Sequence, residues 1–154
     1  MHQDFLNQAV ELACANVENS GGPFGAIIVQ DGKIIAASGN RVSPDLDPTA
    51  HAEIVAIRQA CQTLGDFQLT DCTLYSSCEP CPMCLGAIYW ARLQAVYYAC
   101  NRHDAARAGF DDGFIYTEID QAPQQRRILM QQLALPTANS PFELWQGKAD
   151  KIRY

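Results

Sequence analysis

The segment Cys78–Cys84 places three cysteines within seven residues and separates them with two prolines. Proline holds the residue before it in extended backbone and favours the first position of a helix. We therefore predict that an extended segment ends near Cys78 and that a helix begins at Pro82. Three kinds of site fit such a thiol cluster: a disulfide, a closed iron–sulfur or structural zinc site, and an open catalytic metal site.

The number and context of the cysteines argue against a disulfide. The chain has seven cysteines, an odd number. Its start, MHQDFLNQAVELA, carries an acid at Asp4 and no uninterrupted apolar core, so it does not resemble a secretory signal. We therefore expect a cytoplasmic protein with free thiols, because disulfides are rare in a reducing compartment.

Cys81 and Cys84 have the C-x-x-C spacing of zinc ligands, and at the start of a helix both sulfurs lie on one face. The unpaired N–H groups and the positive dipole end at that position lower the pKa of a thiol. Among three histidines, His51 is the best third ligand, because it opens a predicted helix with Glu53 two residues later. A carboxylate at that offset can take a proton from an activated water. We predict one Zn²⁺ per chain on His51, Cys81 and Cys84, with Glu53 as the general acid–base.

Cys78 leaves two alternatives open. As a fourth ligand it would close the site, and the protein would then be a non-catalytic zinc module. The C-x-x-C-x-x-C order also begins some iron–sulfur sites, but Ile88 stands where the fourth thiol is expected. Because Pro80 keeps the preceding residues out of helical backbone, we favour a site with three protein ligands and an open position for water.

Helical and strand patterns alternate along the chain, which favours an α/β layered fold in a single domain, residues 1–154. Asp31-Gly32 between two apolar runs predicts a tight β-hairpin. The expected elements are strands over 24–30, 33–38, 72–75 and 95–99, helices over 3–18, 51–64, 82–91 and 141–151, and a strand or short helix over 128–133.

The charge and hydropathy of the chain disfavour two classes of partner. The formal net charge is −6, whereas a protein that binds nucleic acid usually presents a basic face. No apolar run approaches the roughly 18 residues needed to cross a bilayer. We therefore expect neither nucleic acid nor a membrane as a partner.

His51-Ala52-Glu53 followed by Pro80–Cys84 matches the H-x-E…P-C-x-x-C pattern of the zinc nucleobase and nucleoside deaminases. The stretches GGPFGAIIV, DPTAHAE, SSCEPCPMCLGAIYWAR and AGFDDGFIY, with the terminal tyrosine, resemble the small bacterial guanine deaminases over essentially the whole chain. The resemblance implies a cytidine-deaminase-like fold, a three-layer α/β/α arrangement around a mixed sheet of about five strands. It also implies a zinc enzyme of purine metabolism that hydrolyses guanine to xanthine and ammonia.

The resemblance assigns further residues. Asp112 matches a proton shuttle beside the substrate amine, Asn40 a residue that hydrogen-bonds the base, and Ala52 a position whose backbone contacts the base. In these enzymes the C-terminal segment is exchanged within a homodimer, so Asp112 and Tyr154 would act in the partner's site. Taken alone, an acid pair in a loop and an asparagine after a glycine are equally well explained as turn residues.

Phe24 and Trp90 are aromatic candidates for stacking on a flat purine, and each is equally a candidate core residue. The tRNA adenosine deaminases share the stretches PTAHAE and EPC-x-MC-x-GA with this chain. The acidic composition and the aspartates of FDD make a poor surface for a phosphate backbone, which favours a small-molecule purine. The sequence leaves open whether the substrate is the free base or the nucleoside guanosine.

Overall fold

The computed structural model describes residues 1–154, which divide into two compact units, Met1–Gly113 and Phe114–Tyr154. The first unit contains the whole β-sheet and the candidate metal ligands. The second contains helical segments and irregular chain only. None of the helices is long and apolar enough to span a membrane.

The sheet of the first unit has four strands in the order β2-β1-β3-β4. The strand β1 (Gly22–Gln30) pairs antiparallel with both β2 (Lys33–Asn40) and β3 (Cys72–Cys78), and β4 (Ala95–Cys100) runs parallel to β3. The sheet is therefore mixed, as expected. It has four strands where the sequence analysis anticipated about five.

The hairpin between β1 and β2 turns at Asp31 and Gly32, as predicted. Both residues have positive φ angles, 49° and 73° respectively. Two consecutive left-handed residues form the hairpin turn whose twist matches that of the flanking strands. The Asp-Gly pair therefore fixes the register of the first two strands.

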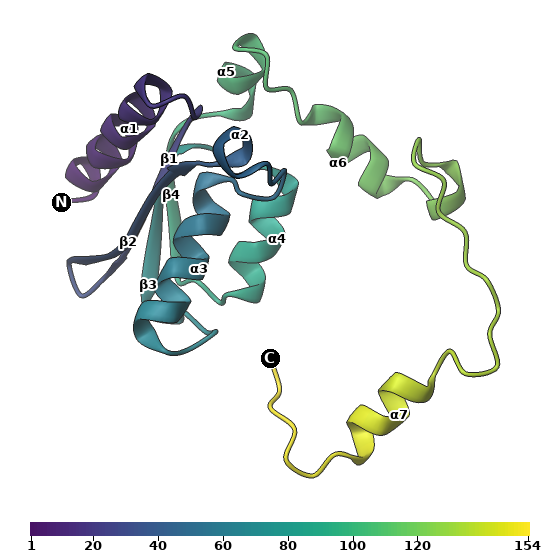
Figure 1. Ribbon diagram of the computed structural model, residues 1–154. Coiled ribbons are helices and arrows are strands. Elements are labelled where there is room, and N and C mark those ends of the chain that lie inside the picture. Colours follow the sequence, from purple (N-terminus) through teal and green to yellow (C-terminus); the bar gives the residue numbers. More distant parts are fainter. The chain divides into compact units, whose positions relative to one another are not determined.

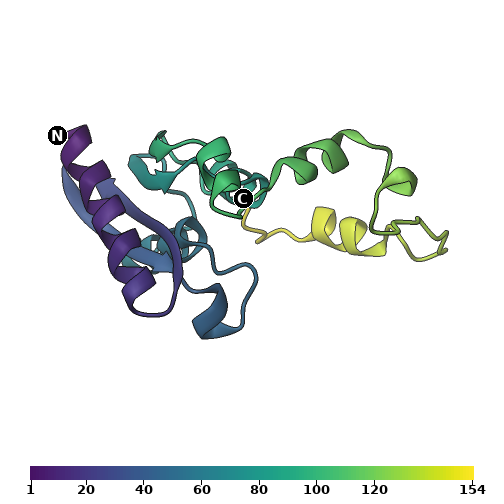
Figure 2. The same ribbon diagram turned by 90° about the horizontal axis from the view of Figure 1, so that it is seen from above.

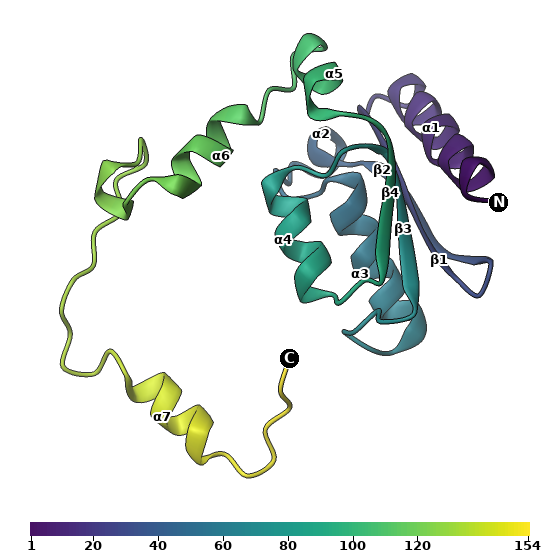
Figure 3. The ribbon, with the colours of Figure 1, turned by 180° about the vertical axis from the view of Figure 1, so that it is seen from behind.

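Helices cover both faces of the sheet. The helix α1 (His2–Glu18) lies along one face, and α3 (Ala52–Leu64) and α4 (Pro82–Trp90) lie on the other (Figures 1 and 3). Successive side chains of β1 point to opposite faces, so Ala26 and Ile28 join the core beneath α3 while Ile27 and Val29 pack against α1. This arrangement confirms the predicted three-layer α/β/α architecture.

Close contact between α1 and the sheet depends on small residues. Ala9 and Ala13 are buried on the helix, and Gly25 faces them from β1. A Cβ atom at Gly25 would lie 2.7 Å from the Ala13 backbone nitrogen and closer still to the Ala9 carbonyl oxygen. The helix can pack this near only because β1 has no side chain at that point. Figure 2 shows α1 beside the sheet from above.

The remaining helices differ from the sequence prediction. The predicted terminal helix is present as α7 (Ser140–Gly147), which ends before the predicted limit. Four further short segments were not predicted, namely α2 (Val42–Asp45), α5 (Arg102–Arg107), α6 (Gly113–Asp120) and the 3₁₀ turn η1 (Pro123–Gln125).

The expected strand or helix over residues 128–133 is wrong, because this stretch is irregular. The side chains of Ile128, Leu129 and Leu133 are 79%, 80% and 71% exposed. Apolar residues form a stable strand only with a neighbouring strand to pair with and a surface to pack on. The second unit contains no strand, so its own residues provide neither.

The contact between Gly25 and α1 gives a first prediction. Replacing Gly25 with alanine should lower the free energy of unfolding by about 1–3 kcal/mol, because the new methyl group meets helix backbone that cannot rotate away. The measurement is the midpoint of urea unfolding.

The matched control is Gly86→Ala, at a helical position of α4 where an added Cβ meets nothing within 4 Å. That change should leave stability unchanged or raise it by about 0.5–1 kcal/mol, because alanine is the better helix former. Equal midpoints for the two variants would contradict the packing argument.

Candidate metal centre

Two helix N-termini bring the predicted ligands together. His51 precedes α3 and Cys81 precedes α4, and both residues have extended backbone, with ψ angles of 154° and 169°. Both residues occupy the capping position without capping the helix in the usual way, and the Cys81 sulfur is paired with Cys84 and His51. The imidazole and the thiol are therefore available to bind a metal ion. Pro82 stands at the first helical position of α4, as the sequence predicted.

The ligand atoms have separations that suit a tetrahedral zinc ion. His51 Nδ1 lies 3.5 Å from the Sγ atoms of both Cys81 and Cys84. All three ligand atoms lie within 4.8 Å of one another. Zinc bound at about 2.1 Å to nitrogen and about 2.3 Å to sulfur in tetrahedral geometry separates those ligands by about 3.6 Å. The donor set and its spacing therefore fit Zn²⁺ with three protein ligands.

Electrostatics in this group favour a thiolate. The hydrogen bond with Cys84 and then that with His51 lower the pKa of Cys81 to about 4. The same contact with Cys81 raises the pKa of His51. An anionic sulfur beside an imidazole, at the positive ends of two helices, is ready to coordinate a divalent cation.

Glu53 lies beside the ligands in a buried position. Its side chain is 6% exposed, and its Oε2 atom accepts a hydrogen bond from the Cys84 thiol at 3.5 Å. The other carboxylate oxygen, Oε1, accepts a hydrogen bond of 3.2 Å from the hydroxyl of Ser76 on β3. Burial raises the pKa of Glu53. A buried carboxyl group that binds its proton more tightly than an ordinary glutamate, next to the ligand group, suits general acid–base chemistry.

Cys78 does not join the ligand group. Its thiol donates a hydrogen bond of 3.7 Å to the carbonyl oxygen of Asn101. Burial raises the pKa of Cys78 to about 11, which favours a neutral thiol over a thiolate ligand. As Pro80 predicted, Cys78 is still in the extended strand β3. The group of side chains that could hold a metal ion therefore consists of His51, Cys81 and Cys84, without Cys78.

Comparison with known proteins agrees with this geometry. Residues 1–100 match the family model for the cytidine and deoxycytidylate deaminase zinc-binding region. The chain belongs to the cytidine and deoxycytidylate deaminase family. Zinc is the cofactor of this family region, and the three adjacent side chains of the deaminase are placed to bind it.

Individual relatives of this deaminase differ in how much of the chain they match. Guanine deaminase of Bacillus subtilis (strain 168) is 58% identical over 99% of both chains. The tRNA-specific adenosine deaminase of Agrobacterium fabrum is 46% identical over 60% of this chain and 63% of its own. The resemblance to bacterial guanine deaminases found in the sequence is thereby confirmed.

Solved structures of guanine deaminases match this chain to different extents. The X-ray structure of the Bacillus subtilis guanine deaminase matches with a TM-score of 0.99 and 57% identity, covering 100% of this chain and 99% of that one. The guanine deaminase of Nitrosomonas europaea matches with a TM-score of 0.68 and 36% identity, covering 71% of this chain and 64% of that one. These matches agree with the cytidine-deaminase-like fold.

Asn40, a predicted substrate residue of the deaminase, is held firmly at the end of β2. It is 7% exposed, and its Oδ1 atom accepts a hydrogen bond of 3.1 Å from the Val42 backbone nitrogen. The Asn16 amide donates to the Asn40 carbonyl at 2.8 Å and to that of Gly22 at 2.7 Å. Asn40 therefore has the turn role weighed in the sequence analysis, and its side-chain NH₂ group is the part suited to a base.

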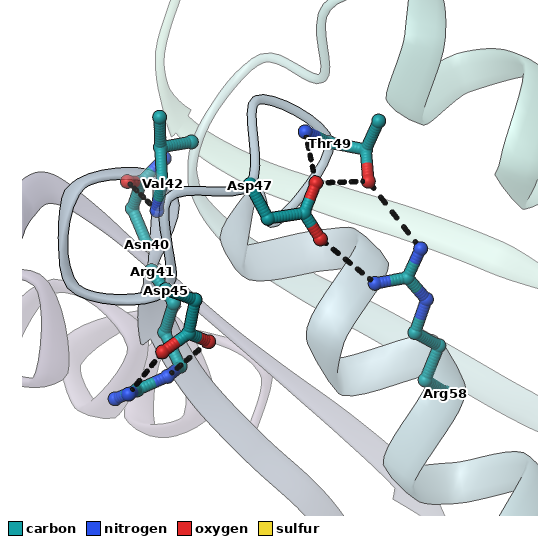
Figure 4. A network of polar contacts seen from close by, with 7 residues as sticks. All are labelled: Asn40, Arg41, Val42, Asp45, Asp47, Thr49 and Arg58. Atoms are coloured by element: carbon teal, nitrogen blue, oxygen red, sulfur yellow. Dashed lines mark hydrogen bonds and ion pairs between the residues drawn. The ribbon is translucent and has the colours of Figure 1, made fainter.

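Charged pairs brace the loop between Asn40 and the histidine ligand. Arg41 forms a bidentate ion pair with Asp45, and Arg58 of α3 lies 3.6 Å from Asp47 (Figure 4). A backbone hydrogen bond of 2.9 Å joins Arg41 N to Ala50 O, immediately before the ligand. Each exposed pair contributes little alone. Together with the backbone bond they give the loop one conformation and fix where His51 begins its helix.

Asp112, the predicted second acid, lies in the first unit, between α5 and α6. Burial and then the charge of Cys81 raise the pKa of its carboxyl group. Asp111 instead accepts a hydrogen bond of 2.8 Å from the Gly113 backbone nitrogen. The two neighbouring aspartates therefore differ in their surroundings.

The other predicted substrate residues are dispersed. Ala52 is buried at the first position of α3, next to His51. Phe24 packs partly on the core and meets Phe110 edge-to-face, with ring centroids 5.0 Å apart. Trp90 is 65% exposed at the C-terminal end of α4, away from the end that carries Cys81. The structure does not bring it to the ligand group.

Two residues near the site were missed by sequence analysis. Ser76 contacts Glu53, and Phe110 contacts Phe24 beside the loop that carries Asp112. The predicted strand ended at Tyr75, so Ser76 fell just outside it, and the only signal was a hydroxyl residue directly after a strand expected to be buried.

Tyr154, the last predicted substrate residue, belongs to the second unit and is 72% exposed.

The position of Cys78 gives the second prediction. Purified protein should contain one zinc ion per chain, and Cys78→Ala should retain it, because that thiol faces Asn101. Cys81→Ala should lose most of the metal, because it removes one of three protein ligands. Metal content is measured by elemental analysis after dialysis, and equal loss from both variants would show that Cys78 is a ligand.

Proposed function

We propose that the protein is a hydrolase that converts guanine and water to xanthine and ammonia. The observation that carries this proposal is the likeness to guanine deaminase over the whole chain, in a protein with an open ligand group beside a buried carboxylate. The match to tRNA-specific adenosine deaminase stops at 60% of the chain. The net charge of −6 also disfavours a tRNA substrate.

His51, Cys81 and Cys84 would hold the zinc ion, which would supply Lewis-acid chemistry by lowering the pKa of water from 15.7 toward about 7. Glu53 takes a proton from the attacking water and delivers it to the ring nitrogen beside the carbon that bears the amine. Attack on that carbon gives a tetrahedral adduct, and a second proton transfer lets ammonia leave. Burial raises the pKa of Glu53, which makes its carboxylate a stronger base toward the attacking water.

Asp112 is the second proton carrier in this proposal. The guanine amine is at C2, between two ring nitrogens, so an acid beside the amine can serve it while Glu53 serves the ring. The raised pKa of Asp112 supports this role, because it makes the carboxylate a better proton acceptor than an ordinary aspartate. Asn40 would hydrogen-bond the purine edge, and Phe24 would contact its face.

The protein is proposed to act as a cytoplasmic homodimer whose C-terminal segments are exchanged. The second unit has no buried residue, and Phe142, Leu144 and Ile152 are 67%, 76% and 70% exposed. Apolar side chains in such number need a covering surface. A partner subunit would provide that surface, and Tyr154 would then help close the partner's site. We propose that Asp112, in contrast, serves the site of its own chain.

The third prediction tests the activity. The purified zinc protein should release ammonia from guanine in preference to guanosine, adenine, cytosine and cytidine. Glu53→Gln should reduce turnover by about 10²–10⁴-fold or more while zinc remains bound, because the amide keeps the shape of the side chain but cannot carry a proton. Preferred release from another base, or near-normal turnover by Glu53→Gln, would overturn this assignment.

The fourth prediction concerns Asp112. Asp112→Asn should reduce guanine turnover strongly without loss of zinc or stability, because it removes a proton carrier that does not bind the metal. Asp111→Asn is the matched control, since asparagine can still accept the hydrogen bond from the Gly113 nitrogen. Equal effects of the two changes would assign both residues to the loop structure.

Mixed dimers then show which subunit supplies each group. A Glu53→Gln chain mixed with a chain lacking residues 152–154 should recover activity, because one site combines an intact Glu53 with an intact tail from the partner. A Glu53→Gln chain mixed with an Asp112→Asn chain should not, because each site lacks one acid. Recovery in the second mixture would place Asp112 in the partner's site.

A further inference from the structure

We propose that Ser76 is a positioning residue for proton transfer, holding one oxygen of the Glu53 carboxylate so that the other faces the metal ligands. This inference rests on the role of Glu53 in the proposed function. It assigns a function to a side chain that neither binds the metal nor belongs to the H-x-E and P-C-x-x-C motifs.

The two oxygens of Glu53 have different partners. Oε1 accepts a hydrogen bond of 3.2 Å from the Ser76 hydroxyl, and Oε2 lies 3.5 Å from Cys84 Sγ, on the side of the ligand group. The two side chains are 6% and 1% exposed, for Glu53 and Ser76 respectively. A backbone hydrogen bond at Glu53 also contacts the carboxylate, and because so little water reaches the pair, the Ser76 hydroxyl is the side-chain donor that holds Oε1.

The surroundings of Ser76 fix its hydroxyl group in one orientation. Ser76 lies on β3 between two neighbouring strands, paired with Ala26 of β1 and Tyr98 of β4. The backbone nitrogen of Cys78 donates a hydrogen bond of 3.4 Å to Ser76 Oγ. With an oxygen lone pair engaged there, the hydroxyl proton is directed to Glu53.

The buried hydroxyl group of Ser76 is costly unless it is hydrogen-bonded, and an alanine would occupy the site at no such cost. The neighbouring Ser77 has a structural partner, because it accepts a hydrogen bond of 3.0 Å from the Gly25 backbone nitrogen. Ser76 also accepts a backbone hydrogen bond, the longer one of 3.4 Å from Cys78, but its own proton goes to the proposed acid–base. Its consequence is therefore expected in turnover rather than in folding.

Fixing the carboxylate matters because proton transfer requires close alignment. Glu53 must reach the attacking water and then the ring nitrogen, and a carboxylate free to rotate reaches both less often. A hydrogen bond to a charged group contributes enough that its loss should reduce kcat about 10- to 100-fold. KM for guanine should change less than about threefold, because Ser76 is not proposed to touch the substrate.

The experiment compares Ser76→Ala with Ser77→Ala in the zinc-loaded protein. Ser76→Ala should lower kcat by that factor with unchanged zinc content, whereas Ser77→Ala should lower the unfolding midpoint and leave kcat within about twofold. Ser76→Thr, which retains the hydroxyl group, should retain most of the kcat that Ser76→Ala loses. If Ser76→Ala does not fold, Ser76→Cys replaces it, because a thiol of similar size is a weak donor.

A double-variant cycle separates positioning from structure. In the Glu53→Gln background, Ser76→Ala should reduce the residual turnover little further, because its partner carboxylate is already absent. A full additional loss, or a kcat of Ser76→Ala within twofold of the unaltered protein, would overturn the inference. Near-normal turnover by Glu53→Gln alone would instead overturn the proposed function, so the two failures are distinguishable.

Discussion

The meeting of two helix N-termini determines the rest of this site. α3 and α4 each begin with a residue that occupies the capping position without capping, His51 and Cys81. In most helices a side chain at that position would satisfy the free backbone N–H groups. Here the side chains are used for the ligand group, while the helix dipoles favour the negative charge that a thiolate and a carboxylate carry. Catalytic chemistry and helix initiation thus share the same residues.

The sheet makes this meeting possible by presenting both helices from one face. β1 is central and carries small or branched side chains on both faces, so α1 can lie on one side while α3 and α4 pack on the other. β3 leads directly into Cys81, and the braced loop after β2 leads into His51. The ligand positions are therefore set by strand ends and helix starts, and a site built on such elements is more precise than one on loops.

Local sequence signals predicted most of the sheet unit. The four strands, the Asp31-Gly32 turn and the starts of α3 and α4 all follow from periodicity and from residues that break or begin elements. The helix α5 was missed although Asn101 and Asp104 form a capping box, a signal spanning four residues. The ligand group was predictable because C-x-x-C spacing is local and because few histidines compete for the third place.

The missed features depend on contacts between distant residues. Ser76 and Glu53 are 23 positions apart, and nothing in either local sequence specifies that they touch. Trp90 was proposed from its chemistry alone. It is the last residue of α4, whereas Cys81 precedes the first residue of that helix. The 128–133 prediction failed because a run of apolar residues needs a partner to become a strand. Pattern analysis identifies such a run but does not supply its partner.

The absence of a core in the second unit has a consequence for how the chain is made and maintained. If a partner subunit covers the apolar side chains of this segment, as proposed, the segment gains its stability from binding and its folding depends on concentration. A newly made chain would carry this segment uncovered until it meets its complement, and exposed apolar stretches are targets for proteases and for aggregation. Abundance in the cell would then be a condition for keeping the chain intact.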